Sequence, residues 1–406
     1  MLKRLYIVFL AAAGSVLFMK CSEKSDPQLD LDKFTTIVDL NKFDAAYHPI
    51  DIQQTTDGGY VVLSERNVTE SHLDGIYLLK LDKHGNFKKE YEVTDSLTNP
   101  VCRLAKIGQK YYFFCMGSTD VGEPTAKLAS FTDALDDFST TDLEGLTYPG
   151  AASLAGQDKF VLLSYNNGEK KSYVTLVSPD GAVGASKGFT VGVGEDSEES
   201  IINHYKRLGK EFPFDAGVVS GNTYYFNGFY EYTMSLVFTD LNGDAPIGVV
   251  QGQRDNGGFS AIAPLGSARF AAARYNFGSN FFLPNPNISI NSISTGLDLG
   301  GLTLPELIPN AKVKILPVTV RDKKVLIYAS DTQSRQIGLY FYDEATGAFL
   351  GSRYLGFSNP FEIGNLIQTE DEGIAVCGTT YLVGRFPRVC VFKLSKQDLE
   401  GSVKVQ

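Results

Sequence analysis

Two segments near opposite ends of the chain share one pattern, and this internal repeat constrains the fold more than any other feature. Residues 54–63 read Gln-Thr-Thr-Asp-Gly-Gly-Tyr-Val-Val-Leu, and residues 368–377 read Gln-Thr-Glu-Asp-Glu-Gly-Ile-Ala-Val-Cys. After nearly the same gap, each is followed by a second apolar run, at residues 76–82 and 389–395. The two copies lie 314 residues apart, which divides into six steps of about 52 residues, a spacing typical of repeat proteins.

Weaker copies of the pattern fill the interval between these segments. Their clearest mark is an apolar run that ends in Asp or Ser before a turn, often one with Asn-Gly or Asp-Gly, which supply the positive φ angles of tight hairpins. Short runs rich in aromatic and β-branched residues, typical of strands, lie between the marks. The marks are residues 78–82, 128–133, 175–180, 236–240, 339–343 and 391–395, with a poorer copy near 288–297, and the runs between them include 160–164, 224–226, 270–275 and 325–328.

The repeat predicts an all-β fold, a β-propeller of about seven four-stranded blades, although six or eight blades also fit. A single small sheet cannot bury both faces, whereas blades stacked around an axis cover one another. The strand at residues 34–40 is predicted to complete the last blade, with residues 402–406 as the alternative outer strand. One helical stretch, at residues 197–210, is expected between the third and fourth units.

The N-terminus has the pattern of an export signal. Lys3 and Arg4 precede an apolar or small-residue stretch at 5–18, which is shorter than the roughly 20 residues that span a bilayer. A buried N-terminal strand or helix is the alternative interpretation. We predict a signal peptide at residues 1–20, a flexible polar tether at 21–33 and a single propeller domain at 34–406.

Cys21, followed by Ser-Glu-Lys-Ser-Asp, resembles the start of a bacterial lipoprotein, in which the cysteine is lipidated and becomes the mature N-terminus. The acidic stretch after it is similar to surface-export signals of Bacteroidetes lipoproteins, although Lys20 stands where a small residue is usual. The unit Thr-Asp-Gly-Gly-Tyr followed by Ile-Tyr-Leu-Leu-Lys-Leu-Asp resembles repeats of secreted β-propeller proteins of these bacteria. The resemblances imply a lipid anchor in the outer membrane at the cell surface, with simple secretion as the alternative, and no fixed catalytic residues.

Charge and motifs exclude several kinds of function. The formal charge of −10 disfavours binding to nucleic acid, whose phosphates such a surface repels. The sequence contains no nucleophile elbow and no phosphate-binding loop, and its four histidines have no metal-ligand spacing, so no catalytic residue, metal or cofactor is predicted. Asp57 and Asp371 occupy matched positions, which favours a repeated role in a turn over catalysis.

The four cysteines after Cys21 form two candidate pairs. If Gly108 and Gln109 form a two-residue turn, Cys102 and Cys115 face each other within reach of a disulfide. Cys377 and Cys390 fall on neighbouring strands of the last unit. An exported protein permits disulfides, and four buried free thiols are the alternative.

Three features could carry binding. Residues 223–232 hold six aromatic side chains that could stack on a sugar or anchor a protein partner, or else fill the core. Residues 276–291 are predicted as a long loop with two adjacent Phe, and 195–199 as an acidic cluster on a solvated face. The candidate binding residues are Tyr224, Tyr225, Phe229, Tyr230, Tyr232, Phe281 and Phe282.

The first hypothesis for function is a binding or accessory module at the cell surface. Its ligand would be a glycan or peptide, or its partner an outer-membrane transporter of a nutrient-uptake system. The second is a polysaccharide-active enzyme with its site in the central channel, and the third is a purely structural module with a flat apolar patch. Convergent carboxylates in the channel would favour the enzyme.

Overall fold

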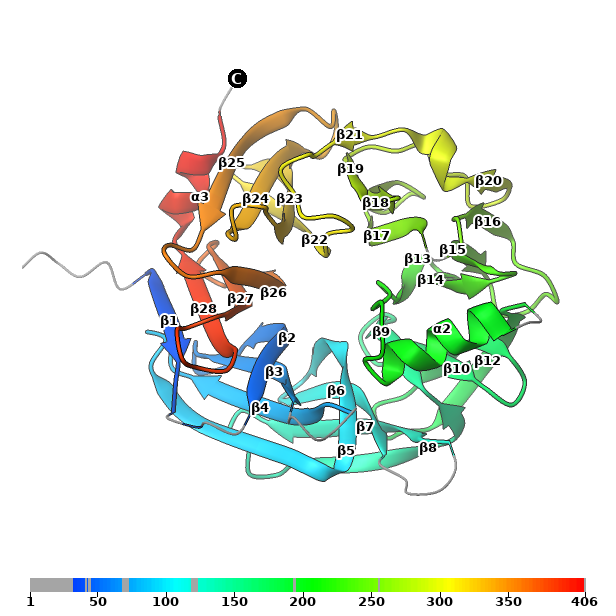
Figure 1. Cartoon of the computed structure of the whole chain (residues 1–406), viewed down its shortest axis with the longest axis horizontal. Helices are drawn as coiled ribbons and strands as arrows, with labels where there is room; N and C mark the ends of the chain where they lie inside the picture. The colour runs from blue at the N-terminus through cyan, green and yellow to red at the C-terminus, as the bar shows by residue number, and fades with distance from the viewer. Residues whose placement is uncertain are drawn as a thin grey trace, which may run out of the picture. The chain divides into compact units, whose positions relative to one another are not determined.

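The computed structural model describes residues 32–40, 42, 45–67, 73–117, 123–192, 195–254 and 256–404. Residues Lys33–Gln406 form one compact unit, distinct from Met1–Asp32. Within that unit, small antiparallel sheets follow one another around a central axis (Figure 1). The predicted β-propeller is therefore confirmed, while the predicted signal peptide and Cys21 lie outside the described residues.

The strands of the described residues form seven blades. The long strand β5 (Phe87–Ile107) joins two of them into one sheet, because it is the outer strand of blade 1 and then the inner strand of blade 2. From the centre outward, blade 1 contains β2 (Ala46–Gln54), β3 (Tyr60–Asn67), β4 (Gly75–Leu81) and the start of β5, and blade 2 contains the end of β5, β6 (Lys110–Gly117), β7 (Thr125–Thr132) and β8 (Ser139–Thr147). Blade 3 contains β9 (Pro149–Leu154), β10 (Phe160–Asn166), β11 (Lys171–Val177) and β12 (Val183–Thr190), and blade 4 contains β13 (Asp215–Ser220), β14 (Thr223–Tyr230), β15 (Thr233–Thr239) and β16 (Gly248–Gln251).

The other three blades complete the ring. Blade 5 contains β17 (Gly257–Pro264), β18 (Phe270–Asn276), β19 (Ser279–Leu283) and β21 (Leu302–Thr303), and blade 6 contains β22 (Val313–Val320), β23 (Lys323–Asp331), β24 (Ile337–Asp343) and β25 (Phe349–Leu355). Blade 7 contains β26 (Phe361–Gln368), β27 (Ile374–Thr380), β28 (Arg388–Leu394) and β1 (Phe34–Val38). Six of the seven predicted repeat marks are third strands, but the copy near 288–297 is wrong. The third strand of blade 5 is β19, while β20 (Ile293–Thr295), followed by the short helix η1 (Gly296–Leu299), pairs in parallel with β16.

The N-terminal strand closes the ring, as predicted. β1 pairs antiparallel with β28, with Phe34 opposite Lys393 at one end of the ladder. The Thr36 hydroxyl donates to the Gly85 carbonyl at 2.8 Å, which ties β1 to blade 1 as well. The alternative closure by residues 402–406 is wrong, because the chain after β28 forms the helix α3 (Lys396–Ser402) instead.

The residue that ends each third strand decides what the chain does next. In four blades an aspartate there accepts hydrogen bonds from backbone amides of the following turn, so the chain reverses into the outer strand. In blade 7 this position is Ser395, which forms a capping box with Asp398 and starts α3. The four aspartates are Asp82, Asp180, Asp240 and Asp343.

The repeated Asp of the two best copies has the predicted turn role. Asp57 Oδ1 accepts from the amide two residues later at 3.0 Å and from Lys80 Nζ at 2.8 Å. Asp371 accepts from the amide two residues later at 3.2 Å and from Lys393 Nζ at 2.8 Å. Both lysines are buried in third strands, so each motif locks its turn to the third strand of the same blade.

The hydrophobic core consists of separate clusters, most of which lie between neighbouring blades. Of the eight hydrophobic clusters in the described residues, seven each lie between two neighbouring blades. The eighth packs beneath the helix α2 (Glu195–Tyr205), which is inserted between blades 3 and 4 as predicted. The helix ends before residue 210, because Arg207 has a left-handed φ of 55°. Among the described residues, no helix has the length and apolar character needed to cross a membrane.

A candidate binding site in the propeller channel

The strongest candidate site is the channel at the centre of the ring. Its cavity has a volume of about 840 Å³ and is lined by inner strands of all seven blades, together with the segment that follows α2. This volume lies within the range of sites for small molecules. Because every blade contributes to the lining, the site forms only when the ring closes.

One-residue bulges interrupt several inner strands beside this cavity. The pairing of β2 with β3 skips Ile50, and the pairing of β26 with β27 skips Gly364, which lies 314 residues later. The inner strands of blades 3 and 5 have the same break, at Gly150 and Ser260. Bulges bend a strand and redirect its side chains, often next to functional sites. Here they turn neighbouring side chains toward the channel.

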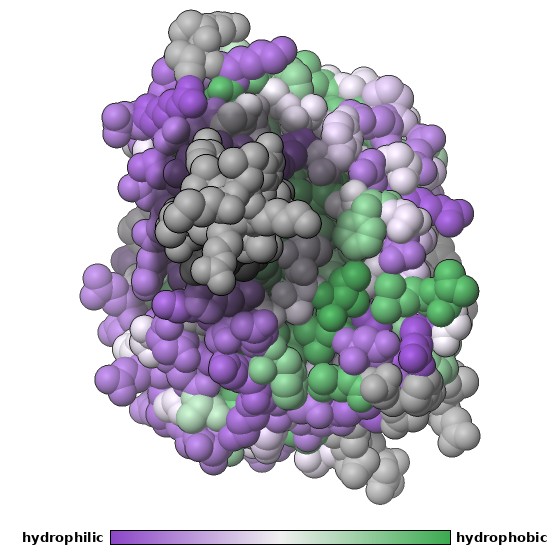
Figure 2. Space-filling model, turned by 90° about the vertical axis from the view of Figure 1, so that its left-hand side faces the viewer, coloured by the Kyte–Doolittle hydropathy of each residue, from purple (hydrophilic) through white to green (hydrophobic). Residues whose placement is uncertain are grey.

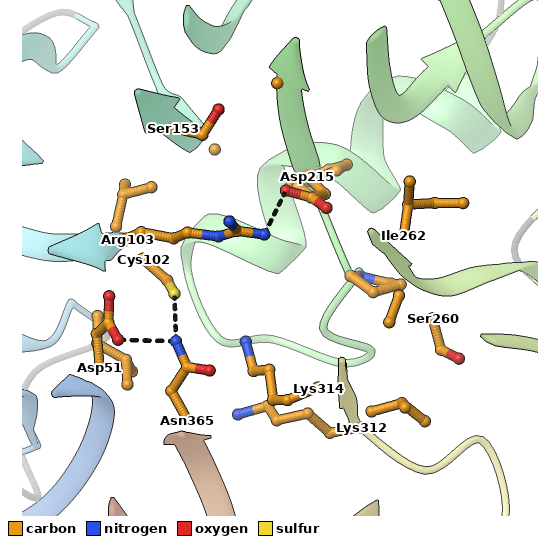
Figure 3. A pocket seen from close by; sticks show the side chains of 18 of the residues that line it. Asp51, Cys102, Arg103, Ser153, Asp215, Ser260, Ile262, Lys312, Lys314 and Asn365 are labelled. Carbon is orange, nitrogen blue, oxygen red and sulfur yellow. Dashed lines mark hydrogen bonds and ion pairs between the residues drawn. The ribbon is translucent and has the colours of Figure 1, made fainter. Parts of the chain in front are cut away.

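Beside two of these bulges, Asp51 and Asn365 join blades 1, 2 and 7 (Figure 3). Asn365 Nδ2 donates to Asp51 Oδ1 at 2.7 Å and lies 3.7 Å from Cys102 Sγ. Asp51 also accepts from the amides of Ile52 at 2.8 Å and Leu104 at 2.5 Å. Burial raises the pKa of Asp51, and these hydrogen bonds oppose the rise. The carboxyl group is therefore engaged in holding the channel wall together.

Arg103 reaches from blade 2 toward Asp215 of blade 4 (Figure 3). Its Nη2 is 4.0 Å from Asp215 Oδ1, and half of the Arg103 side chain is exposed. Asp215 also accepts from the Ala216 amide at 2.9 Å and from the Tyr225 hydroxyl at 3.2 Å. Burial raises the pKa of Asp215, while Arg103 has the largest opposing effect. The arginine is thus only loosely paired.

Lys312 and Lys314 enter the same cavity from blade 6 (Figure 3). Lys312 directly precedes β22 and Lys314 is its second residue, and both side chains point the same way in Figure 3. In the part of the chain that the structure describes, neither ammonium group has a hydrogen bond or an ion pair. Blade 6 therefore presents two unpaired cations to the channel.

The segment after α2 borders the cavity and is pinned to blade 1. Arg207 Nε donates to Asp74 Oδ2 at 2.8 Å, and its Nη2 contacts Glu65. Burial raises the pKa of Glu65 to about 7, against the lowering effect of Arg207. His204 Nδ1 accepts from the Phe212 amide at 2.9 Å, and burial followed by Arg207 lowers the pKa of His204 to about 3. His204 is thus a neutral packing residue at ordinary pH.

Most of the predicted aromatic binding residues belong to the core. Tyr224, Tyr225, Phe229 and Phe282 are buried, Tyr230 and Phe281 are half-buried, and Tyr232 is exposed. Of the two interpretations of these aromatic residues, filling the core therefore holds for the four buried ones, because neighbouring blades cover both faces of the sheets that contain β14 and β19. Residues 279–283 are a strand rather than part of a long loop. Tyr225 alone reaches the candidate site, through its hydroxyl group.

All four described cysteines are free thiols, which is the second of the two interpretations that the sequence left open. Gly108 and Gln109 do form the predicted turn, but the register of β5 against β6 shifts around Cys102, which therefore no longer faces Cys115. In blade 7 Cys377 lies opposite Val391, one position from Cys390. Three of the thiols behave as small core residues, and Cys102 lines the channel.

The acidic residues do not form a metal centre. Among the residues that the structure describes, no group of three or more His, Cys, Asp or Glu side chains is placed to hold a metal ion. In the acidic cluster at 195–199, Glu198 pairs with Lys170 at 2.8 Å.

Tyr225 and Cys102 are the channel residues among the candidates from the sequence, and the charged residues of the channel were not among them. Asp51 and Asn365 lie 314 residues apart, so the repeat offset was a signal that could have identified them. Lys312 and Lys314 were also visible as two lysines two positions apart, a spacing that places side chains on one face of a strand. No comparable signal places Arg103 near them, because blades 2 and 6 meet only across the closed ring.

The outer surface offers a weaker candidate. The side of the molecule that lies at the left of Figure 1 is largely hydrophilic, with a group of hydrophobic side chains upon it (Figure 2). Exposed apolar residues in the connections of blade 7 include Phe357, Val383 and Phe386. They lie in connections between strands and do not line the channel cavity, so the channel remains the stronger candidate.

Comparison with known proteins supports the fold alone. No protein-family model matches the chain, and no curated protein matches it significantly. Similar solved structures include the propeller domain of the Trilobed protease from Pyrococcus furiosus, with 8% identity, a TM-score of 0.46, and coverage of 90% of this chain and 100% of that one. The NanB sialidase from Streptococcus pneumoniae has 10% identity, a TM-score of 0.48, and coverage of 88% and 70%. A structure of NanB plus Optactamide has 10% identity, a TM-score of 0.50, and coverage of 90% and 71%.

Proposed function

We propose that this protein is a binding protein whose ligand site is the propeller channel. The observation that carries this proposal is a cavity of about 840 Å³ to which all seven inner strands contribute. Its volume suits a small molecule, and polar side chains are directed into it by bulged strands. A site assembled from every blade is pre-organised, because closure of the ring fixes all of its walls at once.

A polysaccharide-active enzyme at the same place is the second candidate. Glycoside hydrolysis generally needs two carboxyl groups, one as acid and one as base or nucleophile. Asp51 is held by two backbone amides and Asn365, while Asp215 is held by an amide and the Tyr225 hydroxyl. Since both groups already have partners in the channel wall, the arrangement favours binding over catalysis.

The ligand site is tested by narrowing the channel. Ser153 lines the cavity on β9, and Ser186 lies on the outer strand of the same blade, so Ser153→Trp and Ser186→Trp are a matched pair. Thermal unfolding would be followed with galactose, galacturonate, glutamine and glutamate as probes. We expect at least one probe to stabilise the wild type and Ser186→Trp, by about 2.7 kcal/mol at 100 times its Kd, and not Ser153→Trp. Stabilisation that survives in Ser153→Trp would refute the channel as the site.

We also propose export to the outer membrane by a lipid on Cys21, since acyl chains hold a protein at a bilayer by burial of their methylene groups. The protein would be expressed in a bacterium that processes lipoproteins and fractionated. We expect the wild type and Cys102→Ser in the membrane fraction and Cys21→Ser in the soluble fraction. Recovery of Cys21→Ser with the membrane would contradict a lipid anchor at this residue.

The accessory role in nutrient uptake is a proposal about a partner. Affinity purification of the native protein from detergent-solubilised outer membranes, followed by mass spectrometry, tests it. Co-purification of a transporter barrel is the expected result. Recovery of the protein alone, with its channel still competent to bind a probe, would refute the accessory role and leave the binding function standing.

A further inference from the structure

We infer that the channel ligand is a small organic acid whose anionic group is bound by Lys312, Lys314 and Arg103. The inference rests on the proposed binding function and adds the chemical class of the ligand. It depends on the sign of the charge in the channel, on the availability of the three cations, and on their position around one space.

The charge of the channel is opposite to the charge of the chain. The whole chain has 37 basic and 47 acidic residues, a formal charge of −10. Six basic and four acidic side chains line the cavity among the described residues. Charges of one sign that line a cavity with low-dielectric walls concentrate the field and attract ligands of the other sign. A solute drawn into this channel is therefore expected to be an anion.

Three of these cations are available to a ligand. Lys312 and Lys314 have no ion pair in the described part of the chain, and Arg103 has only the 4.0 Å contact with Asp215. Cations held close together at a partly buried site repel one another, and a bound anion relieves that repulsion. Arginine can bind a carboxylate through two parallel hydrogen bonds, and lysine adds a point charge.

The cations face one space although they come from different blades. Arg103 extends from blade 2, and the two lysines extend from blade 6, with Asn365 of blade 7 beside Lys314 in the view of Figure 3. Arg103 lies 4.0 Å from Asp215, and both Arg103 and Lys314 lower the pKa of Asp215 against the rise caused by its burial. An anionic group of one ligand can therefore reach cations of both blades.

Titration calorimetry with matched probes tests the assignment. Galacturonate and galactose differ by the acidic group, and inorganic phosphate is an anion without the sugar. Each probe would be titrated into the full-length wild type and into Lys312→Met, Lys314→Met and the double control Lys323→Met/Lys324→Met, whose lysines lie at the exposed start of β23. We expect galacturonate to bind at least tenfold more tightly than galactose, and each channel variant to weaken it by about tenfold, while the control leaves it unchanged.

Salt and stability provide further readouts. Binding of galacturonate should weaken as sodium chloride increases, because screening reduces the attraction. The ligand-free Lys314→Met protein should be as stable as the wild type, since it loses no ion pair, so weaker binding cannot be attributed to misfolding. Phosphate binding that needs the same lysines would support the anion site from a second source of negative charge.

The outcomes separate this inference from the proposed function. If galactose bound as tightly as galacturonate, the channel lysine variants bound like the wild type, and Ser153→Trp still abolished binding, the anion assignment would be overturned and the channel would remain the site. Binding unaffected by Ser153→Trp would overturn the channel site itself. Absence of binding by galacturonate and phosphate at millimolar concentration would also overturn the assignment.

Discussion

Replacing Lys80 with methionine removes a buried ammonium group and keeps the approximate length of the side chain. Lys80 Nζ donates to Asp57 Oδ1 at 2.8 Å and to Thr55 Oγ1 at 2.5 Å, and 7% of the Lys80 side chain is exposed. A hydrogen bond that involves a charged group contributes about 1.5–3 kcal/mol. Asp57 is 59% exposed, so solvent screens part of this energy. We expect Lys80→Met to lower the free energy of unfolding by about 2 kcal/mol.

A double-mutant cycle isolates the ion pair from the other effects of the substitution. Combining Lys80→Met with Asp57→Asn should give a coupling energy of about 1.5 kcal/mol, measured by urea unfolding with tyrosine fluorescence. The control is the pair of Lys171 and Glu169, which is exposed on both sides at 3.2 Å and should couple by less than about 0.5 kcal/mol. Equal coupling in the two cycles would refute the claim that burial of the lysine strengthens the repeat.

The copy in blade 7 is an internal replicate. Lys393 Nζ donates to Asp371 Oδ2 at 2.8 Å, and 4% of the Lys393 side chain is exposed. Lys393→Met with Asp371→Asn should therefore couple by about the same amount as the pair in blade 1. A large value in one blade and none in the other would mean that the matched motif does not have a matched energetic role.

The coupling in blade 1 should also depend on pH. Partial burial alone would raise the pKa of Asp57, but hydrogen bonds from Lys80, Thr55 and the Gly59 amide lower it to about 2. Because the folded protein lowers the pKa of Asp57 below its ordinary value of 3.8, the ionised carboxylate stabilises the fold. This stabilisation is complete at pH values above 3.8 and is lost as the pH falls toward 2. We expect the difference between the wild type and Lys80→Met to be constant from pH 7 to 5 and to shrink below pH 4. A difference that grew on acidification would contradict this sign.

The remaining predictions concern the ring seam, the channel wall and the last helix. At Gly85, a Cβ atom would lie 2.4 Å from the Phe34 ring, so Gly85→Ala should destabilise the protein by about 2 kcal/mol or more in urea unfolding. The control is Gly108→Ala, which has open space around it and should show the cost of the positive φ alone, about 1 kcal/mol. Asp51→Ala should lower the free energy of unfolding by about 3 kcal/mol in calorimetry, because it leaves buried amide groups without an acceptor. A loss below about 1 kcal/mol would argue against the role of Asp51 in holding the channel wall together. Ser395→Ala should cost about 1 kcal/mol through loss of the capping box, and an unchanged urea midpoint would show that α3 does not depend on it.

The local features of the fold could be predicted from the sequence because their signals are local and repeated. Strands, turn residues and the role of Asp57 and Asp371 follow from short patterns that recur at each blade. The closing strand at 34–40 was predictable because one blade lacked an outer strand. The poorer copy near 288–297 misled the prediction because degenerate strands there carry no turn signal to fix their place.

It was harder to predict which face of a strand each side chain occupies and what covers that face. A shift of one residue in register moves a side chain to the other face, and the shift around Cys102 has no signal in the sequence. The candidate pair of Cys102 and Cys115, which assumed ideal pairing, is therefore not brought together. Tyr224 and Phe229 are core residues for a related reason, since only the neighbouring blade shows that both faces of their strand are covered.

The sequence by itself determined a ring of similar blades, since each repeat encodes one sheet that needs neighbours to bury its faces. Only the tertiary structure decided the chemistry at the centre. Arg103, Asp215 and Lys314 belong to different blades and are distant in sequence, and they converge because the ring closes. Periodicity encodes each strand, but the contacts across the axis depend on every blade at once.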